Sequence, residues 1–132
     1  MRRCALLVLL ATCSRGEARS VIEAVDRYRK APTDQQPPLA DALEKVPCSD
    51  DEVCAAKDAC VKSASATAKG IRKRQDVERT LAEVVDGSLS KTDPRATKSY
   101  ADLDESDRLM KEGKDALPAC DEKLTTLRIK SH

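Results

Sequence analysis

Apolar residues recur at intervals of three and four over two long stretches, residues 50–86 and residue 94 onward. This spacing predicts two amphipathic helices, because 3.6 residues complete one helical turn. The sequence Ser49-Asp50-Asp51-Glu52 predicts the start of the first helix as a capping box, and Asp86-Gly87 predicts its end. Asp93-Pro94 then predicts the start of a returning helix. The expected buried stripes are Val53, Ala56, Cys60, Ser63 or Ala64, Thr67 or Ile71, Val77, Leu81, Val84 and Val85, then Tyr100, Leu103, Met110, Leu117, Cys120, Leu124 and Leu127.

Each long stretch has an interruption. Residues 70–76 (GIRKRQD) contain Ile71 as their only apolar side chain, which predicts a solvated waist or a kink at Gly70. Gly113 and Pro118 interrupt the returning stretch, so the return arm is expected as either one kinked helix or two helices.

Shorter helices are expected before the first long one. Residues 18–30 place Val21, Val25 and Tyr28 on one face and predict a helix that stops before Pro32. The polar connector 32–38 leads to a short helix with a stripe of Leu39, Ala42, Leu43 and Val46, which ends at Pro47. The expected fold is all-α: a long antiparallel helical hairpin with one or two short N-terminal helices, forming a small disulfide-stapled bundle.

Four cysteines lie outside the first 13 residues, which are described below as an export signal. An even set of cysteines in an exported chain predicts two disulfides. A turn centred near residue 90 brings together positions whose numbers sum to about 180, which favours Cys60 with Cys120 and leaves Cys48 for Cys54. The pairing of Cys48 with Cys60 and of Cys54 with Cys120 stays open. The spacing of these cysteines disfavours zinc, because zinc knuckles use two to four intervening residues and a nearby histidine is lacking.

Composition excludes several classes of function. The chain has 24 basic and 23 acidic residues, no Trp or Phe, and a single histidine, His132. A net charge of +1 gives no general attraction to nucleic acid, and histidine-based catalysis has no usable group. The acidic segment 102–107 lacks the glycine and glutamate of a calcium loop, and the basic run 72–74 is expected to be an exposed face balanced by nearby acids at i, i+4 spacing. We expect no enzyme activity, cofactor or metal.

The first residues are typical of an export signal. Met1-Arg2-Arg3 precedes the apolar run 4–11 (CALLVLLA), which is too short to span a bilayer. The run closes with Leu10-Ala11-Thr12-Cys13, which resembles the lipobox of bacterial lipoproteins. The resemblance implies a signal peptide of residues 1–12 and lipidation of Cys13, with an anchor and short tether over residues 13–19. The helical spacing predicts a single helical domain over residues 20–132. Ser14, in place of the aspartate of inner-membrane retention signals, favours the outer membrane.

The alternative is ordinary cleavage after Ala18, which would release a soluble secreted or periplasmic binding protein, such as a chaperone or an inhibitor. The favoured expectation is a small envelope lipoprotein that is held to the membrane by its lipid. It would act as a structural or protein-interaction module with envelope proteins as partners. The sequence leaves its partner and its oligomeric state open.

Overall fold

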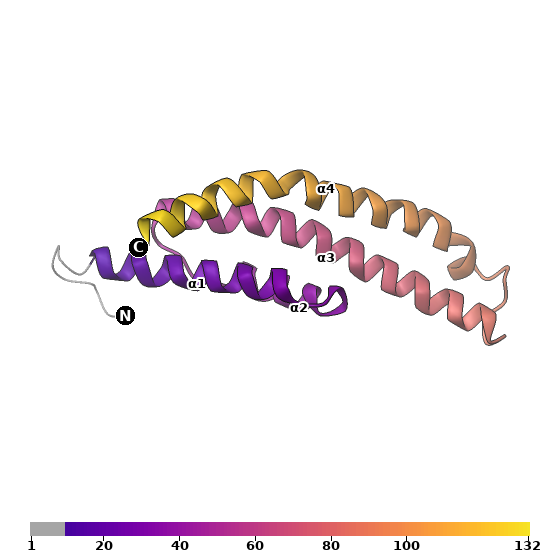
Figure 1. Cartoon of the computed structure of the whole chain (residues 1–132). Helices are drawn as coiled ribbons and strands as arrows, with labels where there is room; N and C mark the ends of the chain where they lie inside the picture. The colour runs from indigo at the N-terminus through magenta and orange to yellow at the C-terminus, as the bar shows by residue number, and fades with distance from the viewer. Residues whose placement is uncertain (1–9) are drawn as a thin grey trace.

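Two long helices, α3 (Asp51–Val85) and α4 (Pro94–Lys130), run side by side in opposite directions in this computed structural model (Figure 1). The structure describes the backbone of residues 10–132 and the side chains of residues 14–132. At about 1.5 Å per residue, the 35 residues of α3 extend roughly 52 Å. The predicted all-α helical hairpin is therefore confirmed.

Local capping explains where these helices begin and end. The Asp50 carboxylate accepts hydrogen bonds from the backbone N–H groups of Glu52 (3.0 Å) and Val53 (3.1 Å). Asp50 is therefore the N-cap, one residue after the Ser49 cap that the capping box predicted. Asp93 caps α4 as expected, and its carboxylate accepts a hydrogen bond from the Arg95 N–H (2.8 Å). Gly87 ends α3 in the left-handed region, with φ of 84°.

Three shorter elements cover one half of the hairpin: α1 (Leu10–Lys30), the 3-10 turn η1 (Thr33–Gln35) and α2 (Gln36–Glu44). The start of α1 and the end of α4 lie at the same end of the molecule, and α2 folds back beside α1 (Figure 1). We call residues 51–71 and 108–130 of the hairpin its proximal half, and residues 72–107, with the turn, its distal half. Residues 13–19, which we expect to carry the anchor and a short tether, lie within α1.

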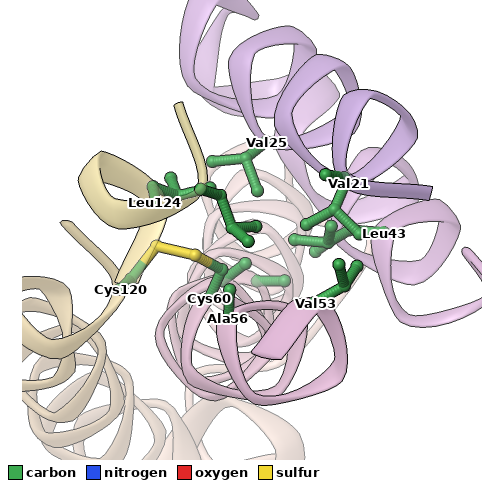
Figure 2. Packing of buried hydrophobic residues seen from close by; sticks show 13 residues of the cluster. Val21, Val25, Leu43, Val53, Ala56, Cys60, Cys120 and Leu124 are labelled. Atoms are coloured by element: carbon green, nitrogen blue, oxygen red, sulfur yellow. A yellow bond between two sulfur atoms is a disulfide. The ribbon is translucent and has the colours of Figure 1, made fainter. Parts of the chain in front are cut away.

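The core lies in the proximal half, where α1, α2, α3 and α4 meet. Figure 2 shows aliphatic side chains of α1 and α2 directed at the disulfide between α3 and α4. The residues labelled there are each at most 2% exposed: Val21, Val25, Leu43, Val53, Ala56, Cys60, Cys120 and Leu124. The expected face of the short helix was partly wrong, because α2 buries Pro37, Ala40 and Leu43.

Two disulfides reinforce this half. Cys60 on α3 is bonded to Cys120 on α4, and Cys48 in the preceding loop is bonded to Cys54 in the first turn of α3. The favoured pairing is confirmed and the alternative is excluded. The bond between Cys60 and Cys120 joins one residue of α3 to one residue of α4 that is 60 positions later in the sequence. It therefore also fixes the register of the two long helices.

Small residues at every seventh position hold α3 and α4 close together. The Ser63 hydroxyl of α3 donates a hydrogen bond to the carbonyl of Gly113 on α4 (2.7 Å), and the Ser106 hydroxyl of α4 donates one to the carbonyl of Gly70 on α3 (2.8 Å). All members of this layer, which we call the small-residue seam, are buried: Ala56, Ser63, Gly70 and Val77 of α3, and Ser99, Ser106, Gly113, Cys120 and Leu127 of α4.

The glycines in the long stretches are therefore contact points between helices. No break in the helix occurs at Gly70, so the predicted kink is wrong, whereas residues 72–76 are exposed or partly exposed, as expected for a solvated segment in mid-helix. The open question about the return arm is resolved as one helix that passes through Gly113 and Pro118. The Pro118 side chain is exposed on the outside of α4. A proline at that position removes one backbone hydrogen bond without entering the contact with α3.

The predicted apolar stripes extend too far into the distal half. Val77 is buried there, but Leu81 is 44% exposed, Tyr100 is 79% exposed and Val85 is 88% exposed. The reason is that α1 and α2 end before they reach these residues (Figure 1).

Candidate binding surface

One side of the hairpin carries a row of large apolar side chains. A second set of residues, again spaced seven apart on each helix, lies beside the small-residue seam: Val53, Cys60, Thr67, Arg74 and Leu81 of α3, and Ala96, Leu103, Met110, Leu117 and Leu124 of α4. In the proximal half, α1 and α2 cover this side and bury Val53, Cys60 and Leu124. In the distal half, Arg74 and Leu81 are exposed and Leu103 is only partly buried, as is Met110 at the adjoining edge of the proximal half.

The uncovered stretch consists of a cavity and the exposed helix face that continues from it, and we call the two together the distal groove. It begins at a cavity of about 190 Å³, where the connector between α1 and α2 meets the middle of the hairpin. That cavity is lined by Thr33, Asp34, Ile71, Arg74, Gln75, Glu78 and Met110. Helical spacing continues the same face toward the turn through Leu81 and Val85 of α3, and through Asp107, Leu103 and Tyr100 of α4.

The charges along the distal groove are mostly acidic. Arg74 forms an ion pair with Asp107 (2.7 Å). Asp34 and Glu78 line the cavity at the start of the groove and form no ion pair within the described residues. The groove therefore combines exposed apolar side chains with a net negative charge.

The opposite side of the hairpin is closed by ion pairs between the helices. Lys73 pairs with Asp102 (3.1 Å), and Arg95 pairs with Glu83 (3.2 Å).

The basic run 72–74 also finds its partners on other helices. Arg72 pairs with Asp41 of α2, while Lys73 and Arg74 pair with Asp102 and Asp107 of α4. The predicted balance by acids at i, i+4 was therefore wrong in its detail. The acidic segment 102–107 lies within α4, so it forms no calcium-binding loop.

A second cleft, of about 230 Å³, lies in the proximal half beside the disulfide between Cys60 and Cys120. Its walls include Val25, Tyr28 and Leu117. Burial raises the pKa of the Tyr28 hydroxyl, which is hydrogen-bonded to Thr67. The hydroxyl of Ser63, which also lines this cleft, is already bonded to Gly113. The cleft can accommodate a small apolar group, and its hydroxyls are engaged in structural hydrogen bonds.

The carboxylates with shifted pKa values in the proximal half have structural roles. The hydroxyl and backbone N–H of Ser49 hold the pKa of Glu17 below its usual range, at O···O and N···O distances of 2.6 and 2.9 Å. A hydrogen bond from the Arg128 guanidinium (2.7 Å) likewise lowers the pKa of Asp26. A general acid requires the opposite shift. Glu17 instead ties α1 to the loop before α3, and Asp26 ties α1 to α4.

The predicted site residues divide into two groups. The structure brings Cys60 to Cys120 and Cys48 to Cys54. Residues 1–9 of the expected signal peptide and the side chain of Cys13 lie outside the described residues. Over the part that is described, the side chains form no cluster of three or more potential metal ligands, and no helix is long and apolar enough to cross a membrane.

Sequence reasoning did not identify the distal groove or the small-residue seam. The sequence did contain a signal for the seam. Ser63 and Gly70 have the same spacing as Ser106 and Gly113, and the residue numbers of each serine and the glycine to which it bonds sum to 176. The groove had no comparable signal, since its exposure depends on where α1 and α2 end. No protein-family model, curated protein or solved structure matches this chain.

Proposed function

We propose that this protein is a small exported lipoprotein of the bacterial cell envelope that acts as a non-catalytic interaction module. Its lipid would be carried by Cys13. The two intramolecular disulfides support export, because such bonds form and persist in oxidising compartments. The single observation that carries an interaction role is the concentration of exposed apolar side chains on the distal half, at Leu81, Val85 and Tyr100.

The contacts of Glu17 and Ala18 favour processing at Cys13 over cleavage after Ala18. Glu17 accepts hydrogen bonds from the Ser49 hydroxyl and from the N–H groups of Ser49 and Asp50, which hold the loop before α3. Ala18 is only 5% exposed and belongs to the proximal core. Cleavage after Ala18 would remove both residues from the mature protein, whereas processing at Cys13 retains them.

An anchor at Cys13 would also orient the molecule. Because α1 starts near this residue and runs along the proximal half, the stapled core would lie next to the membrane (Figure 1). The turn of residues 86–93 would then lie about 50 Å further away, given the length of α3. The distal groove would face proteins of the periplasmic space or an adjoining envelope layer.

Mass spectrometry of the mature N-terminus tests the anchor. We expect an acylated Cys13 in the membrane fraction, and a Cys13→Ala variant that loses the acyl mass. A mature chain that begins at Arg19, or an unprocessed chain with free thiols in the cytosol, would overturn the proposal.

Photo-crosslinking in intact envelopes tests the interaction role. A photoreactive amino acid at Val85 should yield a discrete protein adduct, whereas the same group at Ile129 should not. Ile129 is a matched control because it is 72% exposed, compared with 88% for Val85, and lies at the proximal end. Absence of an adduct at Val85, or the same adduct at both positions, would contradict the role of the distal half.

A further inference from the structure

The proximal half shows what covers the apolar side of this hairpin. There, α1 places Val21 and Val25 into the core, and its Arg29 forms an ion pair with Asp121 of α4. The covering element is thus a helix with aliphatic residues at i, i+4 and a basic residue one turn later. The distal groove continues the same face beyond the end of that helix.

The distal groove repeats the features that α1 recognises. Asp107 lies 14 residues before Asp121 on α4, which is two seven-residue repeats and therefore the same side of the helix. By helical spacing, Leu81, Leu103 and Met110 lie along this face of α3 and α4, and all three are partly or largely accessible. The distance from Ile71 to Val85 is about 21 Å along α3, which matches a helix of about 14 residues.

The charges of the groove select between possible occupants. Asp34 and Glu78 have no ion-pair partner within the described residues, and the basic Arg74 is already paired with Asp107. A second copy of this chain would bring further carboxylates to the same face, and like charges across an interface are unfavourable. A cationic helix would instead supply the missing partners.

We propose that the distal groove binds a cationic amphipathic helix of a partner protein. Aliphatic side chains at i, i+4 and i+7 of that helix pack on Leu81, Leu103 and Met110, and its lysine or arginine residues face Asp34 and Glu78. This inference rests on the proposed interaction role, and it specifies the surface and the chemistry of the partner.

A binding assay with the purified, disulfide-bonded chain tests this inference. The probe is a synthetic 14-residue helix of leucine and lysine with one tryptophan. Because the chain contains no tryptophan, the emission reports only on the peptide. A matched peptide with glutamate in place of lysine is the control for charge. We expect saturable binding of the cationic peptide that weakens as the salt concentration rises, and at least tenfold weaker binding of the acidic peptide.

Variants locate the bound peptide on the chain. The double variant Leu81→Ser, Val85→Ser should weaken binding at least tenfold, and Glu78→Lys should weaken it severalfold. Ile129→Ser and Asp58→Lys, at exposed positions outside the groove, should leave it unchanged. Circular dichroism confirms that each variant is folded. The labelled methyl signal of Met110 should shift with the peptide, which reports directly on the groove.

Three results would overturn the inference: no binding of the cationic peptide, equal binding by the groove variants and the parent, or sedimentation of the chain as a dimer that Leu81→Ser, Val85→Ser dissociates. The last result would identify a second copy as the occupant. The assay does not depend on export or lipidation, so its failure would be distinguishable from a failure of the proposed anchor.

Discussion

Replacing Gly113 with alanine tests how closely α3 and α4 approach one another. A Cβ atom at this position would overlap the Thr67 hydroxyl oxygen and would lie 2.9 Å from the Ser63 carbonyl oxygen and 3.0 Å from the Thr67 backbone nitrogen. Two of these three atoms belong to the backbone of α3, so a change of side-chain rotamer cannot relieve the overlap. The two helices must separate at the layer where Ser63 donates its hydrogen bond to Gly113.

The magnitude follows from two opposing contributions. Alanine is favoured over glycine inside a helix by about 1 kcal/mol. Overpacking a close contact costs about 1–3 kcal/mol, and the short distances at Gly113 place it at the upper end of that range. We expect Gly113→Ala to lower the free energy of unfolding by about 2 kcal/mol. For a chain of this size that change corresponds to a Tm about 8 °C lower, at about 4 °C per kcal/mol.

Gly16→Ala is the matched control, because a Cβ atom there meets nothing within 4 Å. The same substitution should raise stability by up to about 1 kcal/mol at that exposed position in α1. Urea denaturation with both disulfides intact measures both variants, and equal m-values would show that the unfolded state is unchanged. Adding Thr67→Ala to Gly113→Ala should recover only part of the loss, since the backbone contacts remain. If Gly113→Ala were as stable as Gly16→Ala, the close approach of the helices would be wrong.

Three further predictions concern the disulfides, the buried serines and acid stability. Replacing Cys60 and Cys120 with serine should lower stability by about 4 kcal/mol, and replacing Cys48 and Cys54 by about 2 kcal/mol, because the first bond closes a loop of 60 residues and the second a loop of 6; equal losses in urea denaturation would contradict this ranking. Ser63→Ala and Ser106→Ala should each cost about 1 kcal/mol, and the losses should add in the double variant, because the two hydrogen bonds lie in separate layers. Glu17 and Asp26 have folded pKa values below 4.5 and 3.8, so their stabilising contribution is complete above those values and is lost as the pH falls through the lowered folded pKa. The free energy of unfolding should thus decrease below about pH 5, and Glu17→Gln should make this decrease smaller, whereas an unchanged pH profile would show that the Glu17 contact is absent.

Local sequence determined the two long helices and their ends. Asp93 and Pro94 start α4, and Gly87 ends α3, because capping depends on residues within one turn of each other. The same local reasoning located the turn. Cys60 and Cys120 are equally far from it along the sequence, and this predicted the bond between them. In an antiparallel hairpin, two residues lie opposite each other when they are the same number of residues from the turn, so the position of the turn fixes the register.

The tertiary structure alone decided which residues face which neighbour. Gly70 interrupts the apolar pattern of α3, yet it is buried, because Ser106 from 36 residues further along the chain bonds to its carbonyl. Val85 and Tyr100 continue the apolar pattern but remain exposed, because α1 and α2 cover only the proximal half. Burial depends on elements distant in sequence, and a helical repeat specifies a face of a helix without specifying its partner. The distal groove therefore becomes visible only when α1, α2, α3 and α4 are placed together.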